Sequence, residues 1–72
     1  MEAESIKYNG KSYRLERTNS EEYPYILHGP RSAAYTLYRN KPEPHKMFVV
    51  NATGRVLRGW FSDRNGELKQ IA

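Results

Sequence analysis

The chain of 72 residues is long enough for one small domain, which leaves a large share of its surface exposed to water. It carries 12 Lys and Arg against 8 Asp and Glu, a net charge of +4, and no Cys, which excludes disulfides, thiolate metal sites and a Cys nucleophile. No apolar stretch approaches the ~20 residues that span a bilayer, and the N-terminus lacks the features of a signal peptide. We expect one domain over residues 1–72, with residues 1–4 disordered, in the cytoplasm and without a membrane partner.

The first local signal is a hairpin near the N-terminus. Two segments that alternate apolar and polar residues flank Asn9-Gly10, the pair preferred in a two-residue type I′ turn. This turn places Ile6 opposite Tyr13, because its two residues set the register of the strands. One face of the hairpin is then apolar and the other polar, as in a strand pair that covers a core on one side.

Two further short strands are expected on either side of Gly29-Pro30, which breaks regular structure. The first covers residues 25–27 and the second covers residues 33–39. Side chains alternate along a strand, so Tyr35 and Leu37 share one face of the second.

Prolines and glycines predict the structure of the remaining connections. Residues 40–45 contain two prolines, which remove two backbone donors, so we expect an exposed and stiff loop there instead of a central strand. Residues 64–66 predict another turn, and residues 67–71 predict a short last strand. No helix of useful length is indicated.

The segment from Lys46 to Asp63 holds the densest apolar run and the only Trp, and it predicts a central hairpin. A two-residue turn at Thr53-Gly54 suits glycine, which accepts a positive φ. It would place one set of side chains toward the core: Phe48, Val50, Leu57, Gly59 and Phe61. The opposite face would then carry Met47, Val49, Val56, Arg58 and Trp60. A loop of three or five residues would change this pairing.

That second face is too apolar for an ordinary solvated surface. Either the strands bend into a barrel or a terminus covers the face, or an exposed patch binds a partner. The strand pattern as a whole predicts an all-β fold: a small antiparallel meander of about six to seven short strands, curled into a barrel or a strongly bent sheet.

Catalytic and metal motifs are not recognisable in the sequence. Only His28 and His45 are available as imidazole ligands, and both lie beside turn residues. The adjacent Glu21 and Glu22 would point to opposite faces of a strand or into solvent from a loop. We therefore expect no enzyme, no metal and no cofactor.

The distribution of charge suggests where a partner would bind. Residues 1–22 have a net charge of −1, whereas residues 28–58 carry six basic residues against Glu43 alone, a net charge of +5. Local positive charge attracts anionic partners. Arg58 and Trp60 are two residues apart, so on a regular strand their side chains project together.

Two functions are compatible with these patterns. The first is a non-catalytic protein-interaction or self-association module, possible as a homodimer, that uses the apolar face around Trp60. The alternative is a small β-barrel that binds single-stranded nucleic acid through a central basic and aromatic surface. The candidate binding residues for the two are Tyr38, Arg39, Lys41, Lys46, Met47, Val49, Arg55, Arg58 and Trp60.

Overall fold

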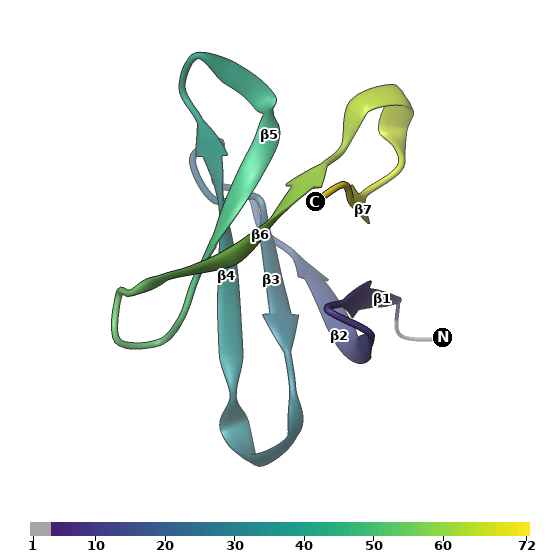
Figure 1. Cartoon of the computed structure of the whole chain (residues 1–72), viewed down its shortest axis with the longest axis vertical. Coiled ribbons are helices and arrows are strands. Elements are labelled where there is room, and N and C mark those ends of the chain that lie inside the picture. The colour runs from purple at the N-terminus through teal and green to yellow at the C-terminus, as the bar shows by residue number, and fades with distance from the viewer. Residues whose placement is uncertain (1–3) are drawn as a thin grey trace.

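Seven strands form one antiparallel sheet in which each strand pairs with its neighbours along the chain (Figure 1). The computed structural model describes residues 4–72. Two single 3₁₀ turns, η1 (Pro30–Ser32) and η2 (Arg64–Gly66), interrupt the meander. The strands are β1 (Ser5–Tyr8), β2 (Lys11–Arg17), β3 (Tyr25–His28), β4 (Ala34–Asn40), β5 (Glu43–Val50), β6 (Val56–Ser62) and β7 (Lys69–Gln70). The predicted all-β meander is confirmed.

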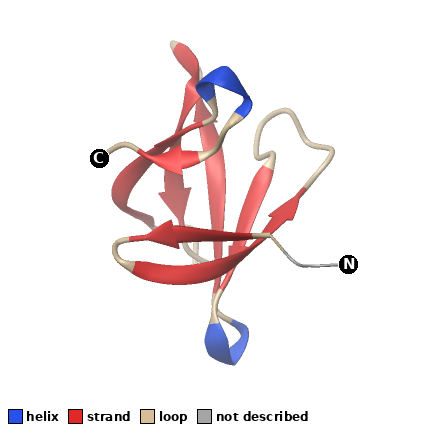
Figure 2. Ribbon diagram, turned by 90° about the vertical axis from the view of Figure 1, so that its right-hand side faces the viewer, coloured by secondary structure: helices blue, strands red, loops and turns tan. Residues whose placement is uncertain are grey.

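The sheet curls until β1 lies against β7, so the fold is a nearly closed barrel (Figure 2). Side chains close the seam. The Asn9 backbone N–H donates to Oε1 of Gln70 at 2.8 Å, and Nε2 of Gln70 donates to Oδ1 of Asn9 at 2.8 Å. The Tyr8 hydroxyl donates to the Arg58 carbonyl at 2.6 Å. Side-chain hydrogen bonds therefore bridge the two edges of the sheet, between which no backbone ladder forms in residues 4–72.

The N-terminal hairpin has the predicted turn and register. Ile6 lies opposite Tyr13, and both turn residues have positive φ, 49° at Asn9 and 83° at Gly10. Disorder was predicted for residues 1–4, of which residues 1–3 lie outside the described residues. At Glu4 the backbone carbonyl accepts a hydrogen bond from the Leu15 N–H at 2.9 Å.

The core is formed by inward-facing side chains of β1 and of the four strands β3 to β6. The fully buried side chains are Leu27, Leu37, Met47, Val49 and Phe61, joined by the rings of Tyr8 and Tyr25. The predicted shared face of Tyr35 and Leu37 is present: Leu37 of β4 lies in the core, with Tyr35 packed against it. The core is thus contributed mainly by alternate residues of β3 to β6, in keeping with the pleat of a strand.

The central hairpin differs from the prediction on β5. Its loop has five residues, 51–55, because the Asn51 carboxamide accepts hydrogen bonds from the backbone N–H groups of Thr53 at 3.1 Å and Arg55 at 2.9 Å. Five residues reverse the facing of β5 relative to β6. Val50 pairs with Val56, and Met47 and Val49 face the core. The predicted inward facing of Leu57 and Phe61 was right, but that of Phe48 and Val50 was wrong.

A bulge in β6 shifts the pairs further along this hairpin. Val49 pairs with Leu57, whereas Phe48 pairs with Trp60, so Arg58 and Gly59 are extra residues on β6. The bulge needs φ = +118° at Gly59. The five-residue loop alone would place Phe48 opposite Arg58, and the two extra residues of the bulge place it opposite Trp60.

The proline-rich segment was also predicted incorrectly. Only Lys41 and Pro42 form the turn, and β5 begins at Glu43, so Pro44 belongs to a strand. The ladder steps from Arg39 opposite Met47 to Asn40 opposite Glu43, which leaves Pro44 within a bulge. A bulge tolerates proline because no ladder donor is required there.

The remaining connections differ in detail. His28, expected in a turn, is the last residue of β3, and its Nε2 lies 2.6 Å from Oε1 of Glu16. The predicted turn at residues 64–66 is present as η2, and β7 is shorter than the strand expected over residues 67–71. Within residues 4–72 there is no helix of the length and apolarity that crossing a membrane requires.

Candidate functional site

An aromatic row crosses the outside of the barrel. Tyr38 of β4 lies opposite Phe48 of β5, which lies opposite Trp60 of β6. The ring centroids of Tyr38 and Phe48 are 5.8 Å apart and stacked, and those of Phe48 and Trp60 are 6.2 Å apart and edge to face. The next pair along the hairpin is Val50 and Val56. We call these five side chains the outer face.

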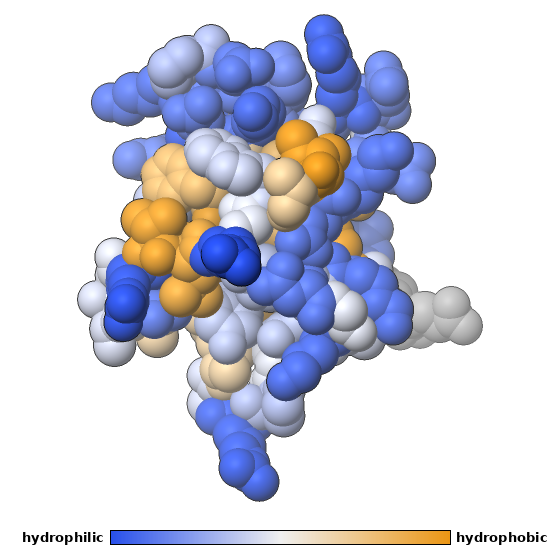
Figure 3. Space-filling view, in the orientation of Figure 1, coloured by the Kyte–Doolittle hydropathy of each residue, from blue (hydrophilic) through white to orange (hydrophobic). Residues whose placement is uncertain are grey.

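The outer face is partly open to solvent. Val56 is 61% exposed, and the three aromatic side chains are half-buried. Figure 3 shows hydrophobic atoms gathered over the β5–β6 hairpin, surrounded by hydrophilic ones. Nζ of Lys46 lies 5.1 Å from the ring centroid of Trp60, a cation–π arrangement. A charged group thus covers part of the indole, while the aliphatic part of the surface has no cover.

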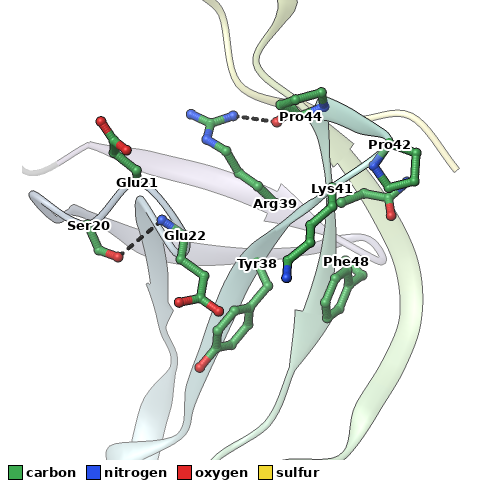
Figure 4. A pocket seen from close by; sticks show the side chains of 10 residues that line it. Ser20, Glu21, Glu22, Tyr38, Arg39, Lys41, Pro42, Pro44 and Phe48 are labelled. Atoms are coloured by element: carbon green, nitrogen blue, oxygen red, sulfur yellow. Dashed lines mark hydrogen bonds between the residues drawn. The ribbon is translucent and has the colours of Figure 1, made fainter.

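A groove of about 1070 Å³ continues the outer face toward the β4–β5 turn (Figure 4). Its floor contains the rings of Tyr38 and Phe48. One wall is the β2–β3 loop with Glu21 and Glu22, and the other is the β4–β5 turn with Lys41. Figure 4 shows the Lys41 amine and the Glu22 carboxylate on opposite sides of the Tyr38 ring. The groove therefore offers an aromatic floor between walls of opposite charge.

Local hydrogen bonds fix the acidic wall. Oγ of Ser20 accepts bonds from the backbone N–H groups of Glu22 and Tyr23, each at 3.2 Å, as serine commonly does in turns. The backbone N–H of Arg39 donates to the Glu22 carbonyl at 2.9 Å. The Tyr23 ring centroid lies 5.5 Å from that of Tyr38. The backbone of the loop is thereby attached to β4, which fixes where the side chains of Glu21 and Glu22 leave the loop.

Arg39 faces the inside of the barrel end and is bound to Asp63. Its Nη2 lies 2.8 Å from Oδ2 of Asp63, and the Tyr25 hydroxyl donates to the same oxygen at 3.0 Å. Burial alone would raise the pKa of Asp63, but the hydrogen bonds from Arg39 and Tyr25 outweigh it and lower that pKa. Burial and the bond to Asp63 raise the pKa of Tyr25. These groups hold the barrel end together.

Replacing Asp63 with Asn is expected to destabilise the fold at neutral pH by about 1–3 kcal/mol, because it weakens the hydrogen bonds of a partly buried Arg39. The lowered pKa of Asp63 means that its stabilisation is fully present above the unfolded value of about 3.9 and is lost as pH falls through the lower folded value. Urea titrations across that acidic range should show the difference between the two proteins shrinking. A difference that is constant with pH would contradict the assigned ion pair.

Two of the predicted binding residues are part of the core. Met47 and Val49 have no exposed surface, so neither contributes to a binding surface in this fold. The reason is the five-residue loop, which turns them inward and turns Phe48 and Val50 outward. Of the apolar face expected from the sequence, Val56 and Trp60 remain on the outside.

The predicted basic residues do not form one surface. Lys41 lines the groove, Lys46 lies over Trp60, and Arg39 is bound to Asp63. Arg55 lies in the β5–β6 loop, and Arg58 lines an opening beside β1 at the other end of the barrel. Lys46 is also paired with Glu43 at 3.9 Å, and Arg39 borders the groove beside Lys41. The five charges are therefore divided between the two ends, and two of the five are already paired.

Sequence reasoning missed four residues of the site. Phe48, the centre of the aromatic row, and Val50 were both assigned to the core through the wrong loop length. Glu21 and Glu22 were interpreted as solvated loop charges, and nothing in their spacing indicated that they face Lys41 across a groove. Asn51, whose side chain organises the loop, was the one local signal for the correct register.

Comparison of the chain with protein-family models, curated proteins and solved structures found no match.

Proposed function

We infer that the chain is a non-catalytic interaction module that binds another protein chain through the outer face. The observation that carries this proposal is the row of Tyr38, Phe48 and Trp60, aligned across three strands beside an exposed Val56. Aromatic residues are enriched in protein interfaces because they bury a large area with few rotatable bonds. An exposed apolar group beside such a row gains free energy when a partner removes it from water.

The charges beside the outer face favour a second copy of the chain as the partner. Glu21 and Glu22 form one wall of the groove, and Lys41 lies on the other. In a two-fold symmetric dimer, the acidic wall of each copy can face the basic wall of the other copy. The same pairing of opposite charges then occurs twice in the interface. Such complementarity selects the orientation of association more than it adds affinity.

These carboxylates also argue for a protein partner over single-stranded nucleic acid at this surface. A phosphate backbone in the groove would approach Glu21 and Glu22 as well as Lys41. Arg39, which the nucleic-acid alternative required, is bound to Asp63. The outer face therefore suits an apolar surface with charges of both signs better than it suits a polyanion.

Replacing Val56 with Lys is expected to weaken self-association at least tenfold, equivalent to about 1.4 kcal/mol. A lysine at this position would bring a charge into the apolar interface, where it loses hydration without gaining a partner. The side chain is 61% exposed in the single chain, so the fold should be retained. Sedimentation equilibrium over a dilution series measures the dissociation constant of both proteins.

The matched control is Ala52→Lys, which adds the same charge to the exposed tip of the same hairpin. It should leave the dissociation constant within about twofold of wild type, because the loop lies beyond the paired strands. Equal weakening by both substitutions would indicate a general effect of charge instead of an interface at Val56. A wild-type chain that stays monomeric at every concentration would overturn the second copy as the partner.

A further inference from the structure

The end of the barrel away from the groove carries an excess of positive charge. Three connections lie there: the β1–β2 turn, the β3–β4 loop and the β5–β6 loop. These segments and the strand residues beside them include four exposed basic residues: Lys11, Arg31, Arg55 and Arg58. The one carboxylate close to them in the described chain, that of Glu16 on β2, is bound to His28. The opposite end carries both signs, with the carboxylates of Glu21, Glu22, Glu43, Asp63 and Glu67 beside the basic groups of Arg17, Arg39, Lys41, Lys46 and Arg64. The net positive charge of the barrel therefore lies mainly at the end away from the groove.

A small opening lies within this basic end, beside the seam between β1 and β6. Three aromatic rings with centroids 5.5 to 6.0 Å apart surround it: Tyr8, Tyr13 and Tyr35. Its volume is about 350 Å³, and the exposed Lys11 and Arg58 contribute to its lining. The β3–β4 loop closes one side, since a Cβ on Gly29 would lie 2.9 Å from Cε2 of Tyr13. Cations and phenols therefore converge on one place.

The phenols at this opening are suited to donate hydrogen bonds to an oxyanion. Burial and the neighbouring Tyr35 raise the pKa of Tyr13, so its hydroxyl keeps its proton at neutral pH. The Tyr8 hydroxyl is occupied by the Arg58 carbonyl, and the hydroxyls of Tyr13 and Tyr35 share a hydrogen bond, so this pair keeps one O–H for a ligand. A phenol donor beside an ammonium and a guanidinium matches the acceptor oxygens of a phosphate group.

We propose that this basic end binds the phosphodiester backbone of single-stranded nucleic acid, with one phosphate at the opening between Lys11 and Arg58. Arg31 and Arg55 lie on two other turns, so the positive charge extends over more than one phosphate. A nucleic-acid strand can contact all of these groups, whereas a single phosphate ion cannot. A flexible single strand can place a phosphate in the opening and bases against tyrosine edges, whereas a duplex holds its bases stacked. This site uses none of the outer face, so it is independent of the proposed interaction module.

The double substitution Lys11→Glu and Arg58→Glu tests the proposal. Fluorescence anisotropy with a labelled oligothymidine of about ten nucleotides should show at least a tenfold loss of affinity at low salt. The slope of log affinity against log salt should fall by about 0.7 for each phosphate that the variant no longer neutralises. Both side chains are exposed, and circular dichroism should confirm that the variant folds. The Tyr13→Phe variant keeps the ring and should lose affinity severalfold, because only the donor is removed.

The matched control reverses two exposed charges elsewhere, Arg64→Glu and Lys69→Glu, for the same change in net charge. It should retain affinity within about twofold. An equal loss in this control would overturn the proposal in favour of diffuse attraction. If inorganic phosphate displaces the labelled oligonucleotide as well as unlabelled oligonucleotide does at the same phosphate concentration, the ligand is a phosphate ion and the proposed nucleic-acid strand is wrong. A Tyr13→Phe variant with wild-type affinity would overturn the opening as the place where a phosphate binds.

Discussion

Replacing Phe61 with Ala is expected to leave most of the chain unfolded at physiological temperature. Phe61 has no exposed surface and lies at the centre of the core, with its ring centroid 5.6 Å from that of Tyr8. Truncating a buried Phe costs about 3–5 kcal/mol, and a core of this size supplies only about 3–5 kcal/mol of net stability. Urea titration followed by far-UV circular dichroism, started at a low temperature that favours the folded state, measures the loss.

The matched control is Phe48→Ala, which removes the same atoms from the outer side of β5, the strand that pairs with β6. Phe48 is half-buried in the aromatic row, so its truncation should cost about 1–2 kcal/mol and leave a folded protein. Sequence reasoning placed both rings in the core, so the pair of variants also tests the facing of β5. Equal losses for the two substitutions would contradict the inward turn of Met47 and Val49.

Local signals were sufficient to predict the existence of most strands. Asn9-Gly10 specified its own turn type, because both residues accept positive φ, and this fixed the register of the first hairpin. Alternation in β4 placed Tyr35 and Leu37 on one face, which is the face that covers the core. Where one turn has one favoured geometry, the sequence determines both the turn and the faces of its strands.

The facing of β5 could not be predicted in the same way, because two loops of different parity were available. Thr53-Gly54 favours a two-residue turn by its glycine, but the Asn51 side chain stabilises a five-residue loop with hydrogen bonds to backbone N–H groups. The difference between the two is a few hydrogen bonds, yet it exchanges every inward and outward residue of the strand. Apolar residues on both faces of β5 removed the alternation that would have decided between them.

The candidate site was predicted only in part, because it depends on contacts between distant segments. Arg39 and Asp63 are 24 residues apart and form an ion pair that no local pattern indicates. Net charge along the sequence suggested one central basic surface. A meander sends successive turns to alternate ends of the barrel, so residues close in sequence, such as Lys46 and Arg55, lie at opposite ends.

Replacing Gly59 with Ala is expected to destabilise the seam of the barrel and the fold with it. The residue has φ = +118°, where a side chain costs of order 1–3 kcal/mol. The added Cβ would also lie 3.0 Å from Cε1 of Tyr8 and 3.1 Å from Nε2 of Gln70. Both side chains make hydrogen bonds that close the seam, so a shift of either loosens the contact between β1 and the C-terminal strands. Urea titration measures the total loss, and hydrogen exchange of the β1 amides reports the seam.

Gly54→Ala separates backbone strain from crowding in this prediction. Gly54 has a comparable φ of +87°, but a Cβ there meets nothing within 4 Å. The control should therefore show only the strain, whereas Gly59→Ala should lose more stability and also increase exchange at β1. If the two variants lose the same stability and β1 stays protected, the side chains of Tyr8 and Gln70 do not close the barrel. If the β1 amides exchange faster in Gly59→Ala and not in Gly54→Ala, closure of the barrel depends on Gly59. This glycine leaves room for the side chains of Tyr8 and Gln70 to bridge the seam, where no backbone ladder forms between the strands. The tyrosine-lined opening beside the seam then depends on the same residue.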